Sequence, residues 1–197
     1  MPAPRMKNLF NEIDKCKPES IIEIGVWDGE NALRMIKYAQ EYHNEIAYYG
    51  FDLFERITDE EIIQEHSKKR NKQPSLIEIT KKLTFNAPIA KITLFQGYTK
   101  ETIPKANIKG PIDFIFIDGG HSIETIKSDW KNIQRFIHKE TVIIFDDYYK
   151  NNNKLGCKSL IDSLDQNKWS IEIFELTDIF EKIGWRQYTQ IVKVVIL

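Results

Sequence analysis

Short runs of hydrophobic residues alternate along the chain with longer amphipathic stretches. The runs are rich in isoleucine and predict five strands, at 20–25, 47–52, 91–95, 112–117 and 141–145. The last two are nearly continuous in apolar residues, which is typical of strands buried on both faces of a parallel sheet. Apolar residues fall on one helical face in 29–42 and in 122–138. This alternation predicts an open α/β fold.

The C-terminal part of the chain continues the pattern. It predicts a helix near 154–166, a strand near 170–176 and a final strand at 189–196. A length of 197 residues is that of one domain. We therefore expect a single domain over 1–197, built on one doubly wound, Rossmann-like sheet of about seven strands.

The segment 53–88 interrupts this regular alternation. It is strongly polar and longer than an ordinary connection between a strand and a helix. Thr58-Asp59-Glu60-Glu61 is a capping box that should begin one helix, and a second short helix is expected at 75–84. A basic run at 68–70 suits either an anionic substrate or a solvated helix end. We interpret 53–88 as a helical insertion or cap.

Composition and charge exclude several classes of protein. With 42% hydrophobic residues the chain can bury a core, and 28 basic against 29 acidic residues give no electrostatic reason to expect nucleic acid. Cys16 and Cys157 are not spaced for zinc or a redox pair, which favours a reducing cytoplasm. No apolar stretch approaches the ~18 residues of a membrane span. A homodimer is compatible with all of these observations.

A glycine-containing turn follows the first predicted strand, in Glu23-Ile24-Gly25-Val26-Trp27-Asp28-Gly29. Glycine lets the backbone turn sharply and lets a ligand lie against the main chain beside a helix N-terminus. The turn therefore predicts a site for a nucleotide-like cofactor. The spacing Gly-x-x-x-Gly differs from the Gly-x-Gly-x-x-Gly of nicotinamide and flavin enzymes, which disfavours a dehydrogenase. A turn without a ligand is the alternative.

Asp52 ends the second predicted strand. A carboxylate at this place can accept two hydrogen bonds from the vicinal hydroxyls of a ribose. An aspartate that merely ends a strand in a turn is the alternative. Together with the glycine turn, Asp52 favours a bound nucleoside.

Three carboxylates follow the fourth and fifth strands. Asp118 begins Asp118-Gly119-Gly120-His121, and Asp146 and Asp147 follow Phe145. Neighbouring strands lie about 4.8 Å apart, so these side chains should converge at one edge of the sheet. Three oxygen ligands without cysteine suit magnesium, or else manganese or calcium, better than zinc. The alternative is that Asp118 and Asp146 cap turns and Asp147 is solvated.

These motifs, with Gly97-Tyr98-Thr99, resemble those of class I S-adenosylmethionine-dependent methyltransferases. The likeness covers about 18–197 and is strongest to the magnesium-dependent O-methyltransferases and the macrocin and mycinamicin sugar O-methyltransferase group. It implies a mostly parallel sheet with an antiparallel C-terminal strand. It also implies that Asp118, Asp146 and Asp147 bind the metal. The cofactor-binding residues that it implies are Glu23, Gly25, Trp27, Gly29, Asp52, Gly97, Tyr98 and Asp118.

The resemblance implies metal-assisted O-methylation of a small molecule with adjacent hydroxyls, such as a sugar or a catechol. Asp118 and His121 are the candidate catalytic residues, and His121 is the general base, a hydrogen-bond donor to the substrate or a residue of the turn. Two positions depart from the family pattern. Tyr98 stands where an acid or amide is common, and His121 stands where catechol-type enzymes have lysine. A dinucleotide-dependent oxidoreductase and a non-catalytic nucleotide-binding module are the alternatives.

Overall fold

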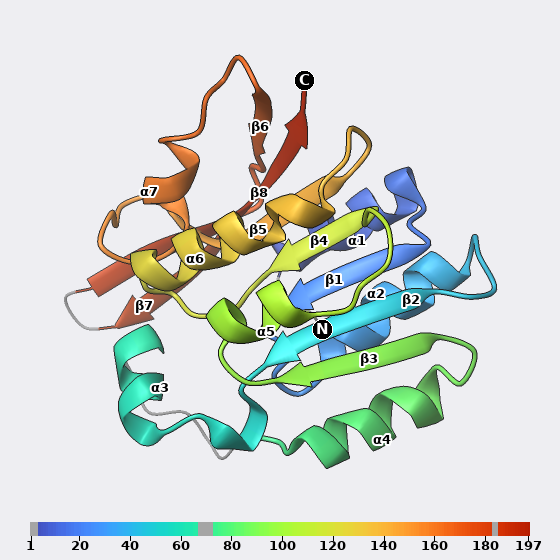
Figure 1. Cartoon of the computed structure of the whole chain (residues 1–197). Helices are drawn as coiled ribbons and strands as arrows, with labels where there is room; N and C mark the ends of the chain where they lie inside the picture. The colour runs from blue at the N-terminus through green and yellow to red at the C-terminus, as the bar shows by residue number, and fades with distance from the viewer. Residues whose placement is uncertain (1–3, 67–72, 183–184) are drawn as a thin grey trace.

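A computed structural model describes residues 4–66, 73–182 and 185–197, and the basic run at 68–70 lies outside these residues. Within them, eight strands form one sheet, in which seven follow the order β3-β2-β1-β4-β5-β8-β6 and β7 pairs with β8 (Figure 1). The strands are β1 (Ser20–Ile24), β2 (Ala47–Asp52), β3 (Lys91–Gln96), β4 (Phe114–Ile117), β5 (Val142–Tyr149), β6 (Trp169–Ile173), β7 (Asp178–Lys182) and β8 (Trp185–Ile196).

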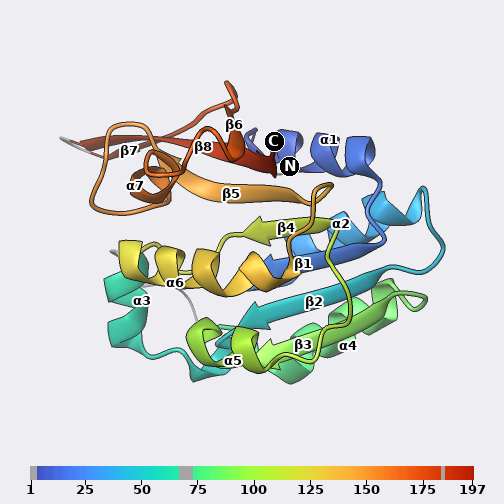
Figure 2. The same cartoon turned by 45° about the horizontal axis from the view of Figure 1, so that its top comes forward.

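Strands β1 to β5 are parallel, and β8 runs antiparallel to β5, β6 and β7. The expected mostly parallel sheet with an antiparallel C-terminal strand is therefore confirmed. Ile24 at the end of β1 is level with Phe51 on β2 and Ile117 on β4. The carboxyl ends of the three central strands consequently meet at one edge, which is visible in Figure 2.

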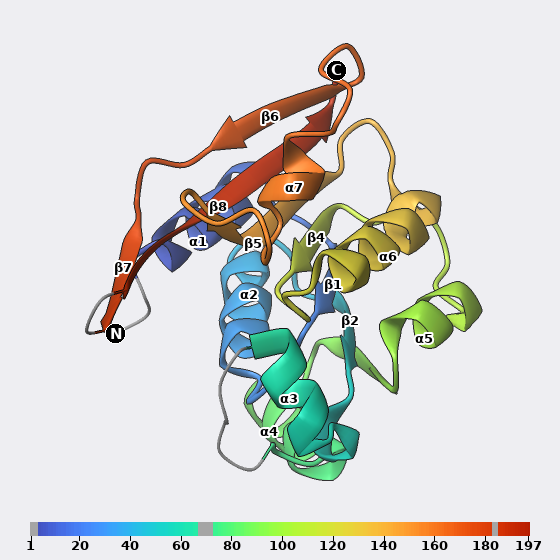
Figure 3. The same cartoon turned by 90° about the vertical axis from the view of Figure 1, so that its left-hand side faces the viewer.

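Helices cover both faces of the sheet, and Figure 3 shows α1 and α2 on one face with α5 and α6 on the other. The longer helices are α1 (Met6–Cys16), α2 (Glu30–Gln40), α3 (Asp59–His66), α4 (Leu76–Asn86), α5 (Thr99–Lys105) and α6 (Ile123–Ile133). The short ones are η1 (Phe54–Arg56), η2 (Gln134–Phe136) and α7 (Lys158–Ile161). Each face buries its own apolar core. The sheet is therefore buried on both sides, as the continuous apolar runs predict.

The structure differs from the predicted elements in several places. Helices α1 and α5 and strand β7 were not predicted, and the helix expected near 154–166 shortens to α7. Strand β8 begins at Trp185, four residues before the expected position, because its first half pairs with β7. Among the described residues, no helix combines the length and apolar character needed to cross a membrane.

The segment 53–88 contains η1, α3 and α4, in agreement with the helices expected there. Thr58 and Glu61 form the predicted capping box, because Thr58 N donates to Glu61 and Glu61 N donates to Thr58. A second capping box, between Ser75 and Glu78, begins α4. The function of this segment as a cap stays a prediction.

Candidate active site

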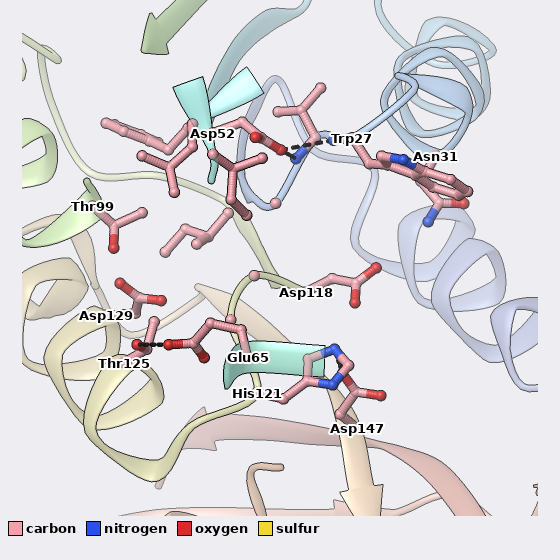
Figure 4. Close-up of a pocket in the computed structure, with 18 of the residues that line it drawn as sticks. Trp27, Asn31, Asp52, Glu65, Thr99, Asp118, His121, Thr125, Asp129 and Asp147 are labelled. Atoms are coloured by element: carbon pink, nitrogen blue, oxygen red, sulfur yellow. Dashed lines mark hydrogen bonds and ion pairs between the residues drawn. The ribbon is translucent and has the colours of Figure 1, made fainter. Parts of the chain in front are cut away.

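A cavity of about 920 Å³ opens at the carboxyl edge of the sheet. It is lined by the β1–α2 turn, the ends of β2, β4 and β5, the start of α5, and residues of α3 and α6. Figure 4 shows side chains from these separate elements pointing toward one space. Cavities of this kind, at the strand ends of an open α/β sheet, are where such folds bind ligands.

The predicted glycine turn forms one wall. Gly25 has φ +89°, and a Cβ atom there would lie 2.1 Å from the backbone oxygen of Asp118. Only glycine therefore allows the ends of β1 and β4 to approach this closely. Gly29, also with positive φ, leads into α2, and the Asp28 carboxylate accepts from Glu30 N at 3.0 Å. Gly25 and Trp27 line the cavity, whereas Gly29 shapes the turn beneath it.

Asp52 holds this turn against β2. One carboxylate oxygen accepts from Val26 N and Trp27 N, each at 2.8 Å (Figure 4). The other accepts from Phe54 N at 2.7 Å. A carboxylate has about four acceptor positions, so one is left toward the cavity. Trp27 has φ +46° and is half exposed at the rim. The site therefore joins Asp52 and the glycine turn, and the ribose contact stays a prediction.

Of three further predicted cofactor residues, Glu23 lies outside the cavity, and Gly97 and Tyr98 line it. Glu23 does not line the cavity but is fully buried within β1, where the Tyr48 hydroxyl donates to it. Burial raises the pKa of Glu23 to about 8. Gly97 and Tyr98 do line the cavity, but the Tyr98 hydroxyl donates to Glu61 on α3. Glu23 is therefore a core residue, and Tyr98 ties α3 to the start of α5.

The carboxylates at the ends of β4 and β5 each have different neighbours. Arg5, directly before α1, binds Asp146 through Nε and Nη2, both at 2.8 Å, and also binds Asp178 on β7. Asp147 turns the other way and lies 2.7 Å from Nε2 of His121. A register shift between Phe145 and Tyr148 makes these consecutive side chains diverge.

His121 lies between two partners. Its Nε2 faces Asp147, and its Nδ1 is 3.0 Å from the Tyr149 hydroxyl. Burial acts to raise the pKa of Asp147, but His121 and Arg5 outweigh it and hold that pKa below its ordinary value. Asp147 is thus an ionised acceptor that favours a proton on Nε2, which leaves Nδ1 as the basic nitrogen. The role of His121 as a general base stays a prediction.

The structure does not show the predicted magnesium site. Among the described residues, no group of histidine, cysteine and carboxylate side chains is arranged to hold a metal ion. The reason is that Arg5 binds both oxygens of Asp146 and Asp146 does not line the cavity, so the positive charge expected from a metal is supplied by a side chain. Asp118 lines the cavity, and burial together with Asp146 and Asp147 raises its pKa well above the ordinary value. The three carboxylates do not fit magnesium in this arrangement.

Several site residues were missed in the sequence. Arg5 and Glu65 come from outside the predicted strand–helix units, and Asp129 lies on the helix that follows β4. Glu65 accepts from Ser122 N at 2.7 Å and from Thr125 Oγ1 at 3.0 Å, so α3 is held against the start of α6 (Figure 4). A signal existed only for Asp129, which is polar at a position where the helix should be apolar.

Comparisons with known proteins bear on this site. The family described as Methyltransferase domain (Methyltransf_24) matches residues 22–148, well over half of the chain. Uncharacterized protein R132 of Acanthamoeba polyphaga mimivirus is 26% identical over 143 residues, which are 73% of this chain and 57% of that protein. The chain therefore spans less than two thirds of the length of this relative.

Solved structures show the same fold. The O-methyltransferase TomG from Streptomyces achromogenes, in complex with SAM, has a TM-score of 0.65 at 11% identity, over 100% of this chain and 81% of that chain. The O-methyltransferase from Bacillus cereus, in complex with SAH, also reaches 0.65 at 14% identity, over 100% and 82%. Precorrin-6y C5,15-methyltransferase from Geobacter metallireducens reaches 0.57 at 13% identity, over 96% and 86%. At these identities the likeness concerns the fold.

Proposed function

This chain belongs to the Methyltransf_24 family of methyltransferase domains, and on that premise we propose that it transfers a methyl group from S-adenosylmethionine to an oxygen of a small molecule. The predicted resemblance to class I methyltransferases is confirmed in family and fold. Membership in this family favours methyl transfer over a dinucleotide-dependent oxidoreductase and over a non-catalytic module. Two of the similar structures are O-methyltransferases, which supports oxygen as the acceptor atom.

The observation that carries the proposal is the pairing of Asp52 with the glycine turn beside His121 and Asp147 in one cavity. When bound, S-adenosylmethionine supplies a methyl carbon on a positively charged sulfur. Asp52 offers its remaining acceptor position to the ribose hydroxyls, and the turn holds the donor against bare backbone. The cavity volume of about 920 Å³ leaves room for a small acceptor, such as a sugar or catechol with adjacent hydroxyls.

His121 removes the proton of the acceptor hydroxyl in this proposal. Asp147 keeps the proton of the neutral imidazole on Nε2, so the acceptor hydroxyl takes the place of Tyr149 at Nδ1 and passes its proton there. Asp147 then stabilises the charged imidazolium at 2.7 Å. Because the Arg5 pair already neutralises Asp146, this route needs no metal ion.

Donor binding is tested by calorimetry with S-adenosylmethionine. Asp52→Ala should weaken binding at least tenfold, because each hydrogen bond to a charged acceptor contributes about 1.5–3 kcal/mol. Glu175→Ala removes an exposed carboxylate that does not line the cavity and should bind like the wild type. Equal affinity in Asp52→Ala and wild type would overturn the ribose contact. No binding to wild type would overturn the proposed function.

Transfer to oxygen is tested with labelled donor and a panel of catechols and sugars. His121→Ala should lower kcat by about 100-fold or more, as expected for loss of a general base, with little change in donor affinity. Wild-type activity should persist in EDTA. Activity that disappears in EDTA and returns with magnesium would instead support the metal-assisted reaction.

A further inference from the structure

Asp129 is a buried acid without a clear structural partner. It lies on α6 and is fully buried, and neither carboxylate oxygen forms a hydrogen bond of ordinary geometry with the residues that the structure describes. Yet it lines the cavity, and Figure 4 shows its carboxylate pointing into it. Burying a carboxylate without partners is costly, so its presence points to a ligand group that completes its hydrogen bonds.

Asp129 lies at the wall of the cavity, next to Gly119, Thr99 and Glu65. A Cβ atom added at Gly119 would lie 3.7 Å from Asp129 Oδ2, so any side chain at that position would stand beside the carboxylate. The Thr99 side chain at the start of α5 lies near it and favours its ionised form (Figure 4). Burial and the negative charge of Glu65 on α3 together raise the pKa of Asp129 to about 7.

The position of Asp129 matches one part of the proposed donor. The sulfonium must lie near His121 and Asp147, at the ends of β4 and β5, and the ribose near Asp52, at the end of β2. The base then extends toward β3 and the start of α5, where Gly97, Thr99 and Asp129 line the cavity. Tyr98 also lies on that wall, and its hydroxyl already donates to Glu61.

We propose that Asp129 accepts a hydrogen bond from the 6-amino group of the donor's adenine and so selects an adenosyl donor over a 6-oxo purine. This inference rests on the proposed function. An amino group satisfies the carboxylate, whereas a 6-oxo group would direct an oxygen at it and leave both acceptors unpaired. Asp129 then performs, from α6, the recognition that an acid after Gly97 would otherwise supply.

The test compares two product-type ligands by calorimetry at pH 8.5, above the raised pKa of Asp129. S-adenosylhomocysteine and S-inosylhomocysteine differ at the purine 6-position, where the amino group gives way to an oxo group. Wild type should bind the adenosyl compound about 10- to 100-fold more tightly. In Asp129→Asn the ratio should fall to within about threefold, because the amide carries both an acceptor and a donor.

Glu124→Gln is the matched control, since it neutralises an exposed acid on the same helix, and it should keep the wild-type ratio. Asp129→Asn is isosteric and should unfold at an equal or higher temperature than wild type, which keeps the comparison valid. A wild-type ratio in Asp129→Asn, or equal binding of both compounds by wild type, overturns the inference while leaving the proposed function standing. Failure of wild type to bind either compound overturns both.

Discussion

The two halves of the cavity edge are held by different kinds of contact. At the ends of β1 and β2, Asp52 binds backbone N–H groups of a turn 25 and 26 positions before it. At the ends of β4 and β5, the carboxylate of Asp146 is neutralised by Arg5, which is 141 positions away. The first half is a local property of two strand–helix units. The second half is held by a pair of residues from distant parts of the chain. A local sequence motif therefore cannot show that Asp146 is neutralised.

Arg5→Met should produce the largest effect, because it leaves Asp146 and Asp178 buried without their cation. Breaking a buried ion pair in this way costs about 3–5 kcal/mol of unfolding free energy. Urea denaturation measures the loss, and Arg135→Met, at an exposed arginine, should lower stability far less. Magnesium should restore part of the loss in Arg5→Met and none in wild type, since a cation can then take the guanidinium's place. A loss below 1 kcal/mol would show that the distant pair is dispensable.

Glu23, beneath the first half, should make stability fall as pH rises from about 4.5 to 8. Its carboxyl is neutral in the folded chain up to about pH 8 but ionises near 4.5 once unfolded. Each pH unit in this window therefore favours the unfolded state by up to about 1.4 kcal/mol. Glu23→Gln should flatten the curve, and the exposed Glu45→Gln should not. The raised pKa of Asp129 also makes stability fall as pH rises. This contribution is the same in wild type, Glu23→Gln and Glu45→Gln. Identical curves for wild type and Glu23→Gln would contradict the assignment.

Glu65 should have the smallest effect, because its contacts connect α3 to α6 without entering the core. Glu65→Ala removes the acceptor for Ser122 N and Thr125 Oγ1. The amides of α3 should then exchange about 5- to 30-fold faster, corresponding to about 1–2 kcal/mol of local stability. Hydrogen exchange read by mass spectrometry measures this, with the exposed Glu60→Ala on the same helix as control. Unchanged exchange in Glu65→Ala would mean that other contacts hold α3 against α6.

Much of the fold could be predicted because strands buried on both faces leave a continuous apolar signal. Strand β2 matches its predicted limits, and β1 and β3 differ by one residue at one end. The Asp28 cap and the Thr58 capping box were also predictable, since both act within three residues. Helix α1 carried a readable signal too, because Met6, Leu9, Phe10 and Ile13 lie on one helical face and all are buried.

The remaining features of the site depend on contacts between residues that are distant in the sequence, which motif spacing cannot predict. Three acids at adjacent strand ends predict a cation but do not distinguish magnesium from a guanidinium on a distant segment. Glu23 belongs to a typical cofactor motif, yet the pleat of β1 points its side chain into the core. There the Tyr48 hydroxyl donates a hydrogen bond to it. Asp129 lies three residues after Ile126 and four before Ile133, both buried. An acid on this apolar face was the only sequence signal that α6 contributes to the cavity as well as to the core.

The long span of the Arg5 pair has a consequence for how the protein is made. Arg5 is synthesised 141 residues before Asp146 and 173 residues before Asp178. A nascent chain can therefore assemble β1 to β4 while Arg5 still lacks both of its acidic partners. The half of the cavity that contains Asp52 can form during translation, whereas the half that contains His121 and Asp147 acquires the Arg5–Asp146 pair only after β5 leaves the ribosome. A chain stalled before β5 would carry the Asp52 half of the cavity while Arg5 still lacks Asp146.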